Sequence, residues 1–376
     1  MNIGIDLLYV KHNKVGGIES YIRNLMDGFI KYADDKFKFY LFTSRDNYES
    51  FSNYFNSSNF NNILCNVKSS KVGKRLIWES LHIDSLAKKN NIDIMFIPVY
   101  NKPFFTFSGI PYITVIHDLQ ILHYPQYFSK IRYNWMKISW KNALKTSKKI
   151  IAISNYVKDD IINSFGIDPK KIDVIYNPIV INKNIKNDIN FEQLKDKYNI
   201  EKDNYFYTVS SMAPHKNLIT LLKVIHRINI ENIDLPNKLV ITGIGGDSKN
   251  KLLQFIDKYN LKDYVIITGF ISNEERDCLY KNCKLFLFSS TFEGFGMPPI
   301  EALMNGIPVV TTKCTSIPEV TENKAVYVDN PFVVNEWIEK IKISINKNQN
   351  KEQFDKYDLE NVSKAYLEQF ISVSKY

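Results

Sequence analysis

Short apolar runs alternate with segments of helical periodicity along almost the whole chain. In the first half, these runs predict β-strands at residues 2–10, 37–43, 62–67, 92–98, 111–116, 150–153 and 173–176. Between the first two strands, one helix face is marked by Ile18, Tyr21, Ile22, Leu25, Met26, Phe29 and Ile30. This alternation is typical of a parallel sheet covered by helices.

The second half repeats the pattern after a polar stretch from Asn182 to Asn204. Strands are expected at 205–211, 238–243, 264–267, 284–288 and 307–311, with helices near 217–229, 249–259, 273–282 and 299–305. A chain of 376 residues is also longer than one core usually grows. We therefore expect an α/β fold of two doubly wound, Rossmann-like domains, residues 1–182 and 183–358, with a helix at 359–376 packing back on the first.

Composition narrows the setting of the protein without naming its activity. The start of the chain lacks the features of a signal peptide, and no run of 18 apolar residues occurs, so we expect a cytoplasmic protein, either free or bound at the inner face of the membrane. Four scattered cysteines suggest neither a zinc site nor disulfides. The net charge of +9 favours an anionic partner. Charge alone does not distinguish a nucleotide from a lipid or a nucleic acid as that partner.

The segment from Thr291 to Val310 carries the most specific chemistry. Pro298 and Pro299 suit the first turn of a helix, and Gly306 suits its end. Gly294 and Gly296 lie just before this helix, where their lack of a Cβ lets a ligand approach the amides at the positive end of the helix dipole. The pattern predicts a phosphate site.

Two carboxylates flank this helix start, Glu293 before it and Glu301 in its first turn. Alone, such a pair more often only complements the helix dipole. Here the spacing, glycines, prolines and following Ala-Leu-Met-Asn-Gly-Ile-Pro-Val-Val closely resemble the E-x7-E signature of glycosyltransferase family 4. The resemblance implies the two-domain GT-B fold, with Glu293 contacting the transferred sugar and Glu301 holding the ribose. Gly294, Phe295, Gly296 and Met297 would line the nucleotide site.

A second motif, Ser210 to Asn217, follows a strand and opens a helix. Lys216 there resembles the family's basic residue that meets the departing phosphates, with Ser211 and His215 beside it. The family usually has arginines where His215 and Ser210 stand, so part of the usual positive charge is missing. We therefore expect Lys216 to supply more of the charge that faces the phosphates. In isolation, Lys216 would be a solvated residue at a helix start.

Three more sites are predicted from position in the chain. Gly16 and Gly17 join the first strand to the first helix, and could present amides to a diphosphate or form an ordinary turn. His117 ends a strand, where ligands bind in open α/β folds, and the resemblance places it beside the reacting sugar. The resemblance also implies that Gly243 and Gly245 form part of the nucleotide wall, with Phe270 and Ile271 bordering the base.

The glycines at 243, 245 and 246 do not make a dinucleotide fingerprint, because Ser248 stands where the third glycine of G-x-G-x-x-G is required. A dinucleotide-dependent oxidoreductase is therefore a much weaker interpretation than a transferase.

Residues Lys130 to Lys149 include seven basic and no acidic residues, with Trp135 and Trp140 among them. They could form a face for anionic lipid or an ordinary solvated helix face.

The resemblance implies a retaining transferase that moves a hexose, of mannosyl, rhamnosyl or glucosyl type, from a nucleotide-diphosphate sugar to a glycan or lipid-linked oligosaccharide. The expected role is surface polysaccharide biosynthesis, including lipopolysaccharide or capsule. No D-x-D pair is present, so we expect no metal; no other cofactor and no nucleic-acid partner are expected. The alternative is a catalytically inactive nucleotide-sugar-binding subunit of an assembly complex.

Overall fold

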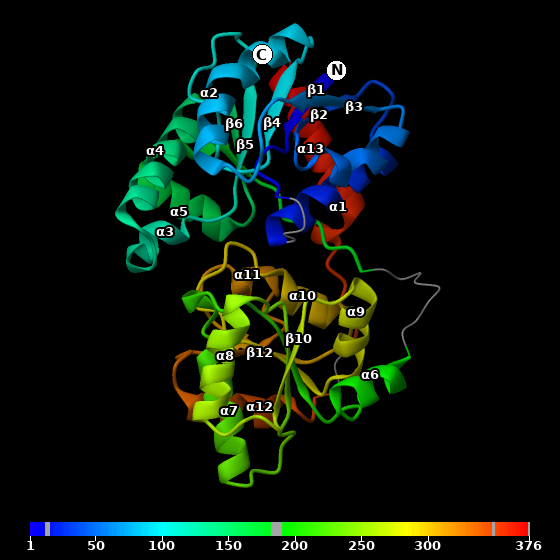
Figure 1. Cartoon of the computed structure of the whole chain (residues 1–376), viewed down its shortest axis with the longest axis vertical. Coiled ribbons are helices and arrows are strands. Elements are labelled where there is room, and N and C mark those ends of the chain that lie inside the picture. The colour runs from blue at the N-terminus through cyan, green and yellow to red at the C-terminus, as the bar shows by residue number, and fades with distance from the viewer. Residues whose placement is uncertain (12–15, 182–189, 348–349, 375–376) are drawn as a thin grey trace. The chain divides into compact units, whose positions relative to one another are not determined.

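The structure is a computed structural model that describes residues 1–11, 16–181, 190–347 and 350–374 (Figure 1). The chain divides into two compact units, Met1–Val180 together with Asp355–Tyr376, and Ile181–Phe354. Each unit contains one parallel sheet with helices packed against it. The expected fold class is therefore confirmed.

The first unit is built on a seven-stranded sheet with the order β3-β2-β1-β4-β5-β6-β7. Its strands are β1 (Asn2–Asp6), β2 (Lys38–Ser44), β3 (Phe60–Cys65), β4 (Ile94–Ile97), β5 (Tyr112–Ile116), β6 (Lys149–Ala152) and β7 (Ile172–Val174). Its helices are α1 (Gly17–Tyr32), α2 (Val72–Lys89), α3 (Gln120–His123), α4 (Lys130–Thr146), α5 (Asn155–Phe165) and α13 (Leu359–Ser374). Because the strand order reverses between β1 and β4, a ligand crevice is expected at their carboxyl ends.

Alternating side chains of the first sheet pack on opposite layers of helices. Phe39 of β2 stacks on Phe29 of α1 with 4.8 Å between ring centroids, and Phe370 of α13 packs against Phe29 and Phe96 on the same side. Phe42 faces the other way, into a cluster that includes Ile83 of α2. Figure 1 shows the C-terminal helix α13, in red, among the blue elements of the first unit. The last helix thus completes the core that the first elements begin.

The second unit is built on a six-stranded sheet with the order β10-β9-β8-β11-β12-β13. Its strands are β8 (Phe206–Val209), β9 (Leu239–Thr242), β10 (Val265–Gly269), β11 (Leu285–Phe288), β12 (Val309–Thr312) and β13 (Val326–Val328). Its helices are α6 (Phe191–Tyr198), α7 (Leu218–Ile230), α8 (Asp247–Lys258), α9 (Asn273–Asn282), α10 (Met297–Met304), α11 (Ile317–Val320) and α12 (Val334–Ser344). Here the order reverses between β8 and β11, so the crevice is expected at their carboxyl ends.

The predicted elements are present with shifted ends, and a few were missed. The first strand was expected over 2–10 but ends at Asp6, because the Asp6 carboxylate accepts the amide of Leu8 (3.0 Å) and turns the chain. The short strand β13 and the helix α12 were not assigned from the sequence. Among the described residues, no helix is both long and apolar enough to cross a membrane.

The close approach of α1 and α13 gives a prediction about stability. A Cβ on Gly28 of α1 would lie 1.9 Å from Ser363 Oγ and 3.0 Å from Leu359 Cδ1, both on α13. Gly28→Ala should therefore destabilise the first unit by about 1–3 kcal/mol through overpacking, although alanine is the better helix former. Urea unfolding followed by tryptophan fluorescence would measure the effect, since Trp78, Trp135 and Trp140 all belong to this unit.

Gly73 is the matched control, because it also lies in a helix but a Cβ there would meet nothing within 4 Å. Gly73→Ala should leave the transition unchanged or slightly raised. Equal midpoints for the two variants would contradict the packing described for α1 and α13.

Candidate functional site

The loop between β11 and α10 forms the centre of the candidate site in the second unit. α10 begins at Met297 with Gly296 as its N-cap, and Gly306 follows its end with φ of +78°, so the helix limits predicted from prolines and glycine are confirmed. Gly296 adopts φ of +90°, a left-handed conformation that favours glycine. Because prolines 298 and 299 carry no N–H, the amides left at this helix start are those of Gly296 and Met297.

Hydrogen bonds from the segment after β12 fix this loop. Thr315 Oγ1 accepts the amide of Glu293 at 2.9 Å, and Ser316 Oγ donates to the carbonyls of Glu293 (2.9 Å) and Phe295 (3.1 Å). Thr315 itself has φ of +53°. Phe295 is buried, whereas Glu293 keeps part of its side chain accessible. The backbone of the loop is thus fixed by these hydrogen bonds, while the Glu293 carboxylate stays partly accessible to a ligand.

Lys216 and Glu293 form an ion pair across two loops of the second unit. Lys216 Nζ lies 2.5 Å from Glu293 Oε1, with 22% and 13% of the two side chains exposed. The ammonium also lies 5.7 Å from the ring centroid of Phe288, at the end of β11. The structure therefore brings together two of the three predicted catalytic residues, a cation and a carboxylate, at the edge where a ligand is expected.

The Lys216 loop is joined to the β11–α10 loop through backbone atoms. The His215 carbonyl accepts the amide of Thr291 at 2.7 Å, and the Lys216 carbonyl accepts the Ser289 hydroxyl at 2.8 Å. Burial, aided by the Lys216 ammonium, lowers the pKa of His215 to about 4. His215 is therefore neutral at pH 7 and does not replace the charge of an arginine. Ser211 is exposed, and its hydroxyl accepts the amide of Ala213.

The predicted nucleotide wall follows β9 and β10. A Cβ on Gly243, whose φ is +98°, would lie 2.8 Å from the Ser210 carbonyl oxygen, so only glycine fits there. A Cβ on Gly245 would lie 2.8 Å from the ring of Phe270, which is 75% exposed. Ile271 follows and is half-buried. The structure thus places an exposed aromatic face over a glycine, a surface on which a planar base can stack.

Glu301 is held by a residue that the sequence analysis missed. It lies in the second turn of α10, one turn later than expected, because the helix starts at Met297. Its Oε2 accepts a hydrogen bond of 3.0 Å from the hydroxyl of Tyr280 on α9. Tyr280 is fully buried and packs edge-on against Tyr207 of β8. In the sequence, Tyr280 looks like any other apolar helix position, so its polar role gives no local signal.

His117 follows β5 in the first unit and is uncharged. Its Nε2 lies 2.7 Å from the carbonyl oxygen of Pro98, so this nitrogen carries the hydrogen and Nδ1 is left as an acceptor. The ring of Tyr21 packs edge-on against the imidazole at 5.0 Å. Burial lowers the pKa of His117 to about 4. His117 can therefore accept a hydrogen bond at neutral pH but supplies no positive charge.

Gly16 is the N-cap of α1 and Gly17 its first residue, and both are exposed. Gly16 has an extended backbone, and a Cβ there would meet nothing within 4 Å, so its own unit does not require glycine. The neighbouring residues Lys14 and Val15 lie outside the described part of the chain. The proposed contact of this turn with a diphosphate stays a prediction.

The expectation for residues 130–149 needs one correction. α4 ends at Thr146, and Trp140 is fully buried against Tyr100 and Phe165, so it cannot anchor the chain at a surface. Trp135 is half-buried and packs on Phe104. A sequence pattern shows that a tryptophan lies in a basic helix, but not which face of the helix it occupies.

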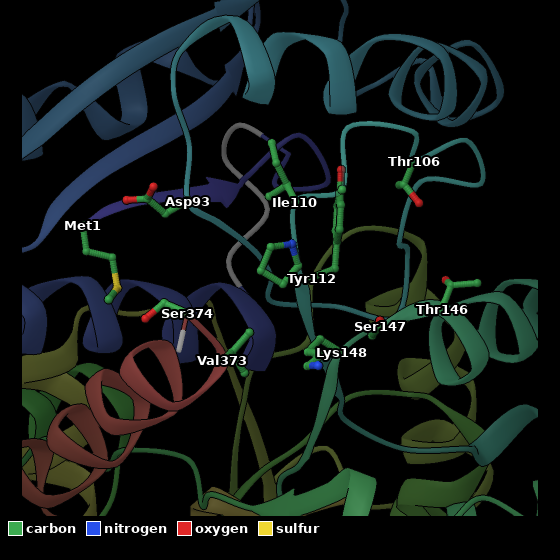
Figure 2. A pocket seen from close by; sticks show the side chains of 12 residues that line it. Met1, Asp93, Thr106, Ile110, Tyr112, Thr146, Ser147, Lys148, Val373 and Ser374 are labelled. Atoms are coloured by element: carbon green, nitrogen blue, oxygen red, sulfur yellow. The ribbon is translucent and has the colours of Figure 1, made fainter. Parts of the chain in front are cut away.

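A cavity of about 760 Å³ lies at the amino ends of strands in the first sheet, opposite the carboxyl ends where a ligand is expected (Figure 2). Its lining includes Met1, Tyr112 and Lys148, which lie at the amino ends of β1, β5 and β6. Ligands of open α/β sheets bind at the carboxyl ends of the strands, so we do not assign the candidate site to this cavity. Within the described ranges, no three His, Cys, Asp or Glu side chains are grouped as metal ligands; metal independence stays a prediction.

The environment of His117 gives a prediction about its titration. A pKa lowered from 6.5 to about 4 means that the folded protein keeps the imidazole neutral, whereas the unfolded chain takes up a proton as the pH falls below 6.5. This residue should therefore cost stability as the pH falls from about 6.5 towards 4. In NMR spectra of histidine-labelled protein, the signals lost in His117→Gln should not titrate between pH 8 and 5. A midpoint near 6.5 would contradict the assignment.

Comparisons with known proteins identify the family of this chain. The family model for "Glycosyltransferase Family 4" matches residues 15–183, and that for "Glycosyl transferases group 1" matches residues 190–360. The chain is 32% identical over 227 residues to the O-antigen chain mannosyltransferase RfbU of Salmonella typhimurium, covering 60% of this chain and 59% of that protein. It is 26% identical to the O-antigen chain mannosyltransferase B of Escherichia coli, covering 58% and 57%. The matches thus span less than two thirds of these relatives' own length.

Solved structures share the fold over the whole chain. Anabaena Alr3699/HepE in complex with UDP and glucose has a TM-score of 0.73 at 18% identity, covering 99% of both chains. Sucrose-phosphate synthase from Thermosynechococcus elongatus has a TM-score of 0.69 at 15% identity, covering 100% of this chain and 96% of the other. With the two family models matching its two halves in succession, the chain belongs to glycosyltransferase family 4 and has the GT-B fold.

Proposed function

We propose that this protein is a retaining hexosyltransferase that uses a nucleotide-diphosphate sugar and needs no metal. The acceptor would be a hydroxyl of a glycan or lipid-linked oligosaccharide in surface polysaccharide biosynthesis. The observation that carries the proposal is the Lys216–Glu293 pair beside the start of α10. The relatives named as O-antigen mannosyltransferases support a mannosyl donor most directly, with rhamnosyl and glucosyl donors as the related possibilities.

In the proposed reaction, the oxygen of the acceptor hydroxyl bonds to the anomeric carbon on the face from which the phosphate leaves. The bond between that carbon and the phosphate oxygen breaks, and the leaving phosphate takes the acceptor's proton. Lys216 and the amides of Gly296 and Met297 would stabilise the charge that develops on the diphosphate. Glu293 would hold the sugar, and the neutral His117 would serve as a hydrogen-bond acceptor for a substrate hydroxyl. The products are the glycoside and a nucleoside diphosphate.

The charges of the second unit favour this assignment of roles. Because His215 is neutral and Ser210 replaces an arginine, Lys216 is the cation that the loop after β8 offers at this edge. When the diphosphate binds Lys216, the ion pair between Lys216 and Glu293 would weaken. The second carboxylate oxygen of Glu293 would then accept hydrogen bonds from the sugar hydroxyls. Glu301, held by Tyr280, would accept from the ribose hydroxyls. Phe270 would cover the base.

The transferase proposal predicts that both members of the ion pair are needed for turnover. Lys216→Ala and Glu293→Gln should each lower kcat/KM by roughly 100- to 1,000-fold, the usual effect of removing one group that stabilises transition-state charge. The assay is release of nucleoside diphosphate from a panel of GDP-, UDP- and dTDP-sugars with a polyprenyl-diphosphate oligosaccharide acceptor. EDTA should not reduce the rate, and NMR of the product should show the donor's anomeric configuration.

Lys262→Ala is the control, because Lys262 is an exposed lysine of the same unit that precedes β10 and pairs loosely with Asp257. This variant should keep full activity. Full activity in both Lys216→Ala and Glu293→Gln would overturn the proposed roles. Nucleotide-sugar binding without turnover of any donor would instead support the inactive-subunit alternative.

We also propose that α4 contacts an anionic membrane in cells, at the inner face where lipid-linked acceptors would be extended. α4 exposes Ile131 (84%) and Ile138 (52%) on one side, between the exposed Lys130, Lys137 and Lys141. The loop before β5 runs beside this helix, since Lys102 and Pro103 carbonyls accept from Asn142, and it exposes Phe107 (88%). Exposed apolar side chains with lysines beside them suit the interface of an anionic bilayer, because the apolar groups can insert and the lysines can meet the headgroups.

This proposal predicts lipid binding that depends on both charge and apolar tips. Vesicles with phosphatidylglycerol should sediment the wild-type chain, and pure phosphatidylcholine vesicles should not. Replacing Lys130, Lys137 and Lys141 with Gln should weaken partitioning on the order of 100-fold, at about 1 kcal/mol per charge. Ile131→Ser with Ile138→Ser should also weaken it.

Ile230→Ser is the control, because Ile230 is 62% exposed on α7 of the second unit. It should bind vesicles as the wild type does. Unchanged vesicle binding in the α4 variants would contradict the proposal, and so would a change that appears only as altered molar mass in light scattering, which would mark this face as a contact between copies.

A further inference from the structure

The helix α9 covers the carboxylate of Glu301 with one face. Tyr280 donates to Glu301 Oε2 from this helix, and Arg276 lies one helical turn before Tyr280, on the same side. Figure 1 shows α9 next to α10 in the second unit. Two potential hydrogen-bond donors therefore project from neighbouring turns of α9 towards the carboxyl group on α10.

Arg276 is poorly paired for so enclosed a cation. About 28% of its side chain is exposed, yet its Nε has no accessible surface and no hydrogen-bond partner among the described residues. Its ion pair, with Oδ1 of the adjacent Asp277, is loose at 3.7 Å. Burial is the largest single influence and opposes the charge, but the Glu301 carboxylate and the neighbouring acidic groups together outweigh it and raise the pKa of the guanidinium. A buried N–H without a partner carries a cost that a bound ligand can remove.

The chemistry of a ribose matches what α9 and Glu301 offer together. Each ribose hydroxyl can both donate and accept a hydrogen bond. When the hydroxyl donates to a carboxylate, the lone pairs of the hydroxyl oxygen can still accept a hydrogen bond from another group. The Tyr280 hydroxyl already donates to Glu301, which leaves the guanidinium of Arg276 as the donor on this face of α9. Arginine suits this role because its N–H groups diverge in a fixed plane.

We infer that Arg276 is a specificity residue of the donor site, donating to the 2′-oxygen of the nucleotide's ribose while Glu301 accepts from the ribose hydroxyls. This inference rests on the proposed function, which places the ribose at Glu301. It predicts that the protein distinguishes ribonucleotides from their 2′-deoxy counterparts, and that Arg276 carries a large part of the difference.

Calorimetry on the full chain tests the inference with UDP and GDP, each paired with its 2′-deoxy analogue. The wild type should bind the ribonucleotide roughly tenfold more tightly than the deoxynucleotide, the worth of one hydrogen bond from a charged donor. In Arg276→Gln the ribonucleotide should lose affinity while the deoxynucleotide does not, so the ratio should fall to about threefold or less. Circular dichroism checks that the variants are folded.

Arg227→Gln is the control, because Arg227 is an exposed arginine on α7 that pairs with Glu231, the C-cap of the same helix. This variant should keep the wild-type ratio. A wild type that does not discriminate, or an Arg276→Gln variant that keeps the ratio, overturns the inference. So does an equal loss for both nucleotides, which would show Arg276 acting through charge alone. If no nucleotide binds the wild type, the proposed function itself fails.

Discussion

The site in the second unit depends on one electrostatic constraint, the pairing of Lys216 with Glu293 at 2.5 Å. Neither side chain is fully exposed, so each would be costly to leave without the other. Hydrogen bonds join the loops that carry them, and the hydroxyls of Thr315 and Ser316, in the segment after β12, bond to the backbone N–H and carbonyl of Glu293. Cation and anion are thus presented together, and in the proposed reaction Lys216 would meet the diphosphate while Glu293 would accept from the sugar hydroxyls.

The surroundings of this pair explain why its charge is concentrated. His215 is neutral because it is buried next to an ammonium, and the two prolines of α10 remove amides that would otherwise face an anion. The start of α10 is left with fewer N–H groups that can face an anion than a helix start usually has, and Lys216 adds the positive charge of the loop after β8. The departures of this chain from its family's arginine pattern therefore raise the dependence on one lysine.

The predicted site residue His117, in the first unit, differs from this charged pair. His117 is held neutral by burial and by its bond to the Pro98 carbonyl, so it offers an acceptor nitrogen and no charge. Its packing against Tyr21 links it to the contact between α1 and α13, because Tyr21 shares a hydrogen bond of 2.6 Å with Tyr366. The C-terminal helix thus supports one of the predicted catalytic residues.

By itself, the sequence determined the parallel α/β class and the start of α10, because hydrophobic period and proline chemistry are local properties. It also singled out Lys216 and Glu293, although not their pairing. Only the tertiary structure decided that Tyr280 holds Glu301, that Trp140 is buried and that Nε of Arg276 has no hydrogen-bond partner among the described residues. Such facts depend on side chains from separate elements meeting in space, which a one-dimensional pattern does not record.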